Sequence, residues 1–132
     1  MDRIEVAEQA LQDMLAHAER THPRECCGLL HGYFEDVTSA VPVRNVHAAP
    51  KTHFEIDPQA LIDAHRAARE GGPLVLGYYH SHPNGLARPS ATDARMAAGD
   101  GAVWAIVAAG CISFWRAGAG EFTALPYEVT PR

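Results

Sequence analysis

Residues 74–93 read LVLGYYHSHPNGLARPSATD, and the order of apolar strand, loop and helix in this stretch determines the expected fold. Leu74 to His82 is apolar and aromatic after a glycine-proline break, which predicts a strand that is buried at its start. Asn84 to Pro89 predicts a loop, and Ser90 to Ala98 predicts a short helix closed by Gly99. The predicted strand therefore carries two histidines at its far end, directly before the loop.

His80 and His82 are two residues apart on this strand. Because strand side chains alternate between faces, both imidazole rings are expected on the same side, where they can share one ion. The loop is short enough to bring the next helix back over the strand end, where Asp93 supplies a carboxylate. Two histidines and one carboxylate leave one position open on a tetrahedral zinc ion, as in catalytic sites. The pattern predicts one zinc ion per chain, bound by His80, His82 and Asp93.

Each of these residues also has an ordinary structural interpretation. Ser90 and Asp93 have the spacing of a capping box at a helix start. A single histidine at a strand end is commonly not a ligand, and Glu25 taken alone is commonly a solvated turn residue, here beside Arg24. The joint occurrence of the histidines, the serine and the aspartate favours the metal site. Capping by Ser90 is compatible with that site.

The other predicted elements are a mixture of helices and strands. Helices are expected at about residues 6–21 and from Asp57-Pro58 to Gly71-Gly72. Strands are expected at residues 26–30, 37–46, 103–109, 112–116 and 121–129, with Pro42 marking an edge or a bulge. This mixture favours the α/β class, with helices packed on the faces of a mixed sheet. At 132 residues the chain has the length of one domain, so a single domain over residues 1–132 is expected.

Composition narrows the partners and the compartment. Hydrophobic residues make up 47% and charged residues 20%, which is typical of a folded globular chain. The net charge is −5 and basic residues form no run, so nucleic acid is not expected as a partner. Met1 to Gln12 lacks the pattern of a signal peptide, and no apolar stretch has the length of a membrane span. A cytoplasmic protein without membrane association is expected.

The three cysteines do not form a disulfide framework. Cys26 and Cys27 are adjacent and Cys111 lies in an apolar run, so reduced and buried thiols are the expected state. Neighbouring strand residues point to opposite faces, and neither Cys26 nor Cys27 has an identifiable histidine partner. Packing is therefore favoured over a nucleophilic role.

The chain resembles the MPN/JAB metallopeptidase family in its JAMM motif. The matching residues are His80-Ser81-His82-Pro83, then Pro89-Ser90-x-x-Asp93, and Glu25 in the run from Pro23 to Leu30. The resemblance extends loosely to residues 45–58 and so to nearly the whole chain. It implies a curved mixed sheet, with layers like those of cytidine deaminases.

The resemblance also implies an activity. The protein is expected to be a zinc peptidase or isopeptidase whose metal ligands are His80, His82 and Asp93. Glu25 matches the general acid/base that moves protons between the attacking water and the leaving amine. Ser90 matches the serine that donates a hydrogen bond to the developing oxyanion, a contact worth about 3 kcal/mol in other enzymes.

The short chain resembles the compact bacterial and archaeal members, which implies a particular substrate. This is a small ubiquitin-like or sulfur-carrier protein with a C-terminal Gly-Gly tail, cut from a peptide extension, an amino acid or a lysine. A narrow groove could admit the glycine backbone by strand addition, along the strand before His80 or along residues 45–54. The resemblance leaves the oligomeric state open, a dimer included.

Two competing functions remain to be weighed. A zinc-dependent nucleobase deaminase needs His-x-Glu followed by Pro-Cys-x-x-Cys, and the cysteines of this chain do not supply that pattern. The other alternative is a catalytically silent MPN-like module that binds a ubiquitin-like partner. No position of the motif is substituted, which argues for the enzyme.

Overall fold

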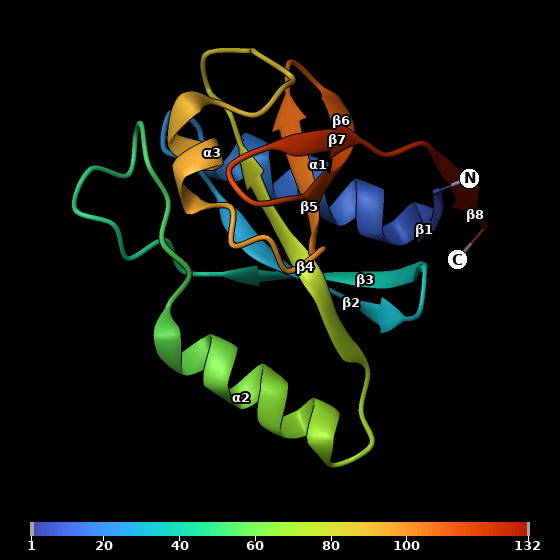
Figure 1. Cartoon of the computed structure of the whole chain (residues 1–132). Coiled ribbons are helices and arrows are strands. Elements are labelled where there is room, and N and C mark those ends of the chain that lie inside the picture. The colour runs from blue at the N-terminus through green and yellow to red at the C-terminus, as the bar shows by residue number, and fades with distance from the viewer. Residues whose placement is uncertain (1, 132) are drawn as a thin grey trace.

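Residues 2–131, which the computed structural model describes, form three helices and a single eight-stranded sheet (Figure 1). In chain order the elements are β1 (Ile4–Ala7), α1 (Glu8–Thr21), β2 (Cys27–Tyr33), β3 (Asp36–Val43), α2 (Pro58–Arg69), β4 (Leu74–Ser81), α3 (Ala91–Met96), β5 (Val103–Ala108), β6 (Cys111–Ala117), β7 (Phe122–Ala124) and β8 (Tyr127–Thr130). The strand order is β7-β6-β5-β4-β2-β3-β1-β8. Met1 and Arg132, which belong to the predicted domain of residues 1–132, lie outside the described residues.

The sheet is mixed, as predicted. β1 pairs in parallel with β3 and β8, and β4 pairs in parallel with β5, whereas the other pairs are antiparallel. Pro42 pairs with Gly28 of β2, and the pairing of β1 with β3 is confined to Asp36 and Val37. Pro42 therefore lies where β3 has a strand on one side, as its missing N–H group requires.

The sheet curls until its two ends meet. β7 and β8 lie at opposite ends of the strand order, yet only Leu125 and Pro126 separate them in the chain. The N–H of Leu125 donates to the carbonyl of Phe114 at 2.9 Å, and the rings of Phe114 and Tyr127 lie 4.6 Å apart. These contacts join the strands of one end to the other and produce the predicted curvature.

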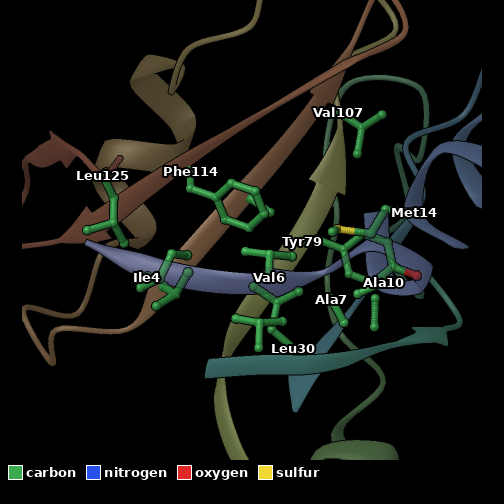
Figure 2. Close-up of a cluster of buried hydrophobic side chains, with 14 of the residues drawn as sticks. Ile4, Val6, Ala7, Ala10, Met14, Leu30, Tyr79, Val107, Phe114 and Leu125 are labelled. Carbon is green, nitrogen blue, oxygen red and sulfur yellow. The ribbon is translucent and has the colours of Figure 1, made fainter. Parts of the chain in front are cut away.

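α1 packs on the inner face of this curl. Ala10 and Met14 of the helix are fully buried against Val6, Leu30 and other apolar side chains of the strands, a cluster that Figure 2 shows. Burying one side chain of methionine or leucine size contributes about 2 kcal/mol. The helix is thereby held across the strands that carry the predicted site.

α2 and a second apolar cluster lie on the other face. Cys27, Phe54 and Trp104 form the buried part of that cluster, whereas Cys26 belongs to the cluster around α1. The two adjacent cysteines therefore point to opposite faces, as predicted. Figure 1 shows α2 on the side of the sheet away from α1, and Asp57 caps it by accepting a hydrogen bond from the N–H of Gln59 at 3.1 Å.

Two predictions about the chain ends are wrong. The first helix was expected from about residue 6, but Ile4–Ala7 form β1 and α1 begins at Glu8. The expected strand at residues 121–129 is two strands, β7 and β8, in different parts of the sheet. In both places the pairing partner is remote in sequence, so local pattern carries little information about it.

None of the helices in residues 2–131 combines the length and the apolar character needed to cross a membrane.

Candidate metal centre

His80, the first predicted ligand, lies on β4 between aromatic side chains. His80 is fully buried and lies in register between Cys27 of β2 and Ile106 of β5. The ring of Phe54 stacks on it, with centroids 4.3 Å apart, and the ring of Trp104 meets it edge-on at 5.6 Å. The imidazole is therefore held in one orientation by packing.

The three predicted ligands converge on one point. The Nε2 atoms of His80 and His82 lie 3.0 Å apart, which confirms that both rings project to the same side. Asp93 Oδ1 is 3.1 Å from His80 Nε2, and Asp93 Oδ2 is 3.0 Å from His82 Nε2. All three residues are buried, and one ligand atom from each lies within 4.8 Å of the others. Two imidazole nitrogens and a carboxylate form a donor set that fits zinc.

Contacts behind the ligands orient them toward that point. His82 Nδ1 lies 2.8 Å from the carbonyl of Leu86, and because a carbonyl only accepts, Nδ1 carries the proton and leaves Nε2 free as a ligand. His80 Nδ1 is buried and has no hydrogen-bond partner in residues 2–131. All polar interactions of the His80 ring are therefore made at Nε2, on the side of the site.

The start of α3 holds the carboxylate. The N–H of Ser90 donates to Asp93 Oδ2 at 2.9 Å, and the N–H of Asp93 donates to Ser90 Oγ at 3.0 Å. This reciprocal pair is a capping box, so the structural interpretation of these two residues is correct. It is also compatible with metal binding, because Asp93 still presents both oxygens to the histidines.

Proton affinities within the cluster are strongly coupled. Burial tends to raise the pKa of Asp93, but its hydrogen bonds to both histidines hold that pKa far below the ordinary value. Burial lowers the pKa of His80 despite the nearby carboxylate. Burial acts in the same direction on His82, yet the bonds to Asp93 and Leu86 and the nearby acidic charges leave its pKa raised. In the metal-free protein His82 is thus the histidine that holds a proton more readily.

Glu25 is buried beside this cluster, so the alternative of a solvated turn residue is wrong. The residue is only 6% exposed. Burial, together with the charge of Asp93, raises its pKa to about 7, although His82 partly opposes this change. Its own N–H donates to the carbonyl of Pro50 at 2.7 Å, which anchors the backbone. A carboxyl group with this pKa can both accept and release a proton near neutral pH.

Asn45 fixes the position of Glu25 and was not singled out in the sequence. Its Nδ2 donates to the carbonyls of Glu25 and His53, at 3.0 and 2.9 Å. Its Oδ1 accepts from the N–H groups of His47 and Glu55, at 3.1 and 3.0 Å. All four bonding positions of this amide are used, and no local pattern would have revealed it.

Ser81, between the two histidines, makes a second connection. Its Oγ accepts a hydrogen bond from the N–H of Cys26 at 2.9 Å, and its N–H donates to the carbonyl of Cys26 at 3.1 Å. The residue after Glu25 is therefore tied directly to the end of β4. The spacing of Glu25 from the ligand cluster is set by the sheet itself.

One of the two predicted edges for strand addition is wrong. The strand before His80 is β4, which is hydrogen-bonded to β2 on one side and to β5 on the other. It has no free edge to offer. In residues 45–54 the pairing is limited to the start of the segment, where the N–H of Val46 donates to the carbonyl of Glu55. That second edge stays a prediction.

Comparison with known proteins identifies relatives of similar size. The chain is 37% identical over 110 residues to a desampylase of Haloferax volcanii, and the match covers 79% of each protein. It is 41% identical over 87 residues to a probable TtuB-protein conjugate cleaving protease of Thermus thermophilus, covering 66% of this chain and 58% of that protein. A solution structure of a Desulfitobacterium hafniense protein, 29% identical, matches with a TM-score of 0.85 over 98% of this chain and 94% of that one.

A family profile gives the same result. The profile described as prokaryotic homologs of the JAB domain matches residues 7–118. The matched range contains all five predicted site residues, Glu25, His80, His82, Ser90 and Asp93. It also contains the strands and helices that position them. The curled mixed sheet, the buried His-His-Asp cluster and the profile match together confirm the resemblance, and the chain belongs to the prokaryotic homologs of the JAB domain.

Proposed function

We propose that this chain is a zinc-dependent peptidase or isopeptidase that hydrolyses the bond after the C-terminal Gly-Gly tail of a small ubiquitin-like or sulfur-carrier protein. The observation that carries the proposal is the convergence of two buried imidazoles and a carboxylate beside a buried glutamate. The names of the relatives, a desampylase and a TtuB-protein conjugate cleaving protease, support the reaction and the substrate class. The three free cysteines further support a cytoplasmic location, although Cys111 is exposed and not buried as predicted.

His80, His82 and Asp93 are the residues that would hold the zinc ion. Zinc, when bound, supplies Lewis-acid activation of water and of the substrate carbonyl. The chain provides the enclosure for this chemistry: Phe54 and Trp104 shield His80, and the capping box fixes Asp93. One donor atom from each of the three residues lies within 4.8 Å of the others in the protein alone, which supports this assignment.

Glu25 is proposed to move the proton. As the oxygen of water joins the carbonyl carbon, the Glu25 carboxylate accepts a proton from that water. As the carbon–nitrogen bond breaks, it returns the proton to the leaving amine nitrogen, so the glutamate ends in its starting state. A pKa of about 7 places both steps within reach at neutral pH.

Ser90 is proposed to stabilise the carbonyl oxygen as it becomes negative. Its Oγ accepts the N–H of Asp93, which leaves the hydroxyl proton free to be donated. This role is consistent with the cap, because donor and acceptor functions of one hydroxyl are separate. Donors of this kind are worth about 3 kcal/mol of transition-state stabilisation in other enzymes.

Zinc content and cleavage, measured together, test the proposal. The wild-type protein and Glu25→Gln are expected to contain about one zinc ion per chain by elemental analysis, and His82→Ala is expected to contain none. Wild type alone should cleave a carrier protein whose Gly-Gly tail bears a C-terminal extension. A zinc-loaded wild type that binds the carrier but leaves every extension uncut would favour the silent binding module. Wild type that takes up no zinc would contradict the metal site.

A further inference from the structure

A hollow of about 270 Å³ opens at Glu25, between the end of α1 and the end of β3. Arg24 and Arg44 are among its lining residues, with Asn45 beside them. The volume lies just below the usual range for small-molecule pockets, so it suits a short group rather than a folded domain. Glu25 and the two exposed arginines therefore line the same small space.

The two arginines come from separate elements and have no acidic partner. Arg24 follows α1, where its N–H donates to the carbonyl of Thr21, and Arg44 follows β3. Neither side chain forms an ion pair or a hydrogen bond within residues 2–131. Arg116, by contrast, is bound to Asp2 and Glu35. In a chain of net charge −5, two arginines without an ion-pair partner in residues 2–131 thus line one hollow.

The chemistry of the glutamate indicates which part of the substrate this hollow receives. If Glu25 protonates the leaving nitrogen, the group bonded to that nitrogen lies against the surface next to Glu25. A second hollow, of about 580 Å³, has His82 among its lining residues. Its lining is largely apolar and includes the acidic Glu19, so it offers no arginine to a carboxylate. Of these two hollows, only the one lined by Glu25 has arginines among its lining residues.

We propose that Arg24 and Arg44 bind the terminal carboxylate of the leaving group. The preferred substrate is then a Gly-Gly tail joined to a single amino acid or short peptide with a free carboxylate, rather than to a lysine of a folded protein. This inference rests on the proposed function. In the reaction water adds to the tail carbonyl, the carbon–nitrogen bond breaks, and the amine leaves protonated with its carboxylate unchanged. Guanidinium groups suit this task because they form paired hydrogen bonds to carboxylates.

Two matched substrates isolate the carboxylate. A carrier protein ending in Gly-Gly-Ala is compared with the same protein ending in Gly-Gly-alaninamide, which differs only in the terminal charge. Wild type is expected to show kcat/KM at least about tenfold higher for the carboxylate form, mainly through KM. The double variant Arg24→Gln/Arg44→Gln should lose this preference and show equal kcat/KM for the two forms. Arg69→Gln, at the end of α2, is the matched control and should retain the preference.

A binding measurement without turnover separates the subsite from the reaction. The peptide Gly-Gly-Ala, with a free or an amidated terminus, is titrated calorimetrically into Glu25→Gln with and without the two arginine changes. The free form should bind at least about tenfold more tightly, and only while the arginines are present. Equal cleavage and binding of both forms by the intact arginine pair would overturn the inference while leaving the proposed function standing. Failure of wild type to cleave either carrier would overturn the proposed function, and the inference with it.

Discussion

The burial of Glu25 predicts a pH-dependent cost to stability in the metal-free protein. Its pKa is raised from 4.5 to about 7, because burial disfavours the charged form. The stability associated with the neutral carboxyl group is therefore fully present below pH 4.5 and is lost as the pH rises through 7. A pKa difference of about 2.5 pH units corresponds to about 3 kcal/mol of unfolding free energy. Glu25→Gln replaces the carboxylate with a neutral side chain of the same shape and removes this cost.

Urea unfolding in the presence of a chelator, at pH 4.5 and at pH 8, measures the effect. Glu25→Gln is expected to match wild type at the lower pH and to exceed its unfolding free energy by about 3 kcal/mol at the higher pH. Glu55→Gln, which changes an exposed glutamate of the neighbouring loop, should follow wild type at both. If wild type and Glu25→Gln lose stability in parallel between the two pH values, the glutamate is not desolvated and its proposed proton-carrying role loses its physical basis.

Three further predictions concern the surroundings of the site. Zinc affinity should fall as the pH falls through the raised pKa of His82, because a protonated imidazole cannot bind metal. Chelator competition measures this affinity, and an affinity that does not change between pH 5.5 and pH 8 would contradict the prediction. Asn45→Ala should lower the unfolding free energy measured in urea by about 3 kcal/mol, since two carbonyls and two N–H groups lose their hydrogen-bond partner. The control Thr52→Ala changes an exposed residue and should have little effect. Equal effects of the two variants would refute the bridging role of Asn45. Ser90→Ala should lower the unfolding free energy by about 1 kcal/mol, because the helix cap is lost. The variant should retain zinc but show a kcat at least about 100-fold lower. An unchanged kcat would exclude the oxyanion role.

The ligand cluster was predictable because it depends on short-range geometry. His80 and His82 share a side since strand side chains alternate, and the spacing from His82 to Asp93 allows only a loop and the start of a helix. The identity of the elements carrying these residues therefore suffices to bring them together. Glu25 was assigned by resemblance, and its burial is visible only once β2 and β4 are paired.

The features that were missed depend on contacts between remote parts of the chain. β1 is four residues long, and its identity as a strand comes from pairing with β3 and with β8. Asn45 acquires its role because residues 25, 47, 53 and 55 all approach its amide. Arg24 and Arg44 likewise line one hollow because α1 and β3 end beside it. No periodic pattern in the sequence predicts such contacts between remote residues.

The pairing of β1 with β8 has a consequence for synthesis on the ribosome. Among the described strands, Ile4–Ala7 is made first and its partner Tyr127–Thr130 is made last. Until that last strand emerges, the outer edge of β1 stays unpaired and Leu125 cannot close the curl over Phe114. The nascent chain must therefore carry an open sheet edge until Tyr127–Thr130 has been made, a state exposed to mispairing with other chains. Closure of this sheet therefore waits for the strand that is made last among those described.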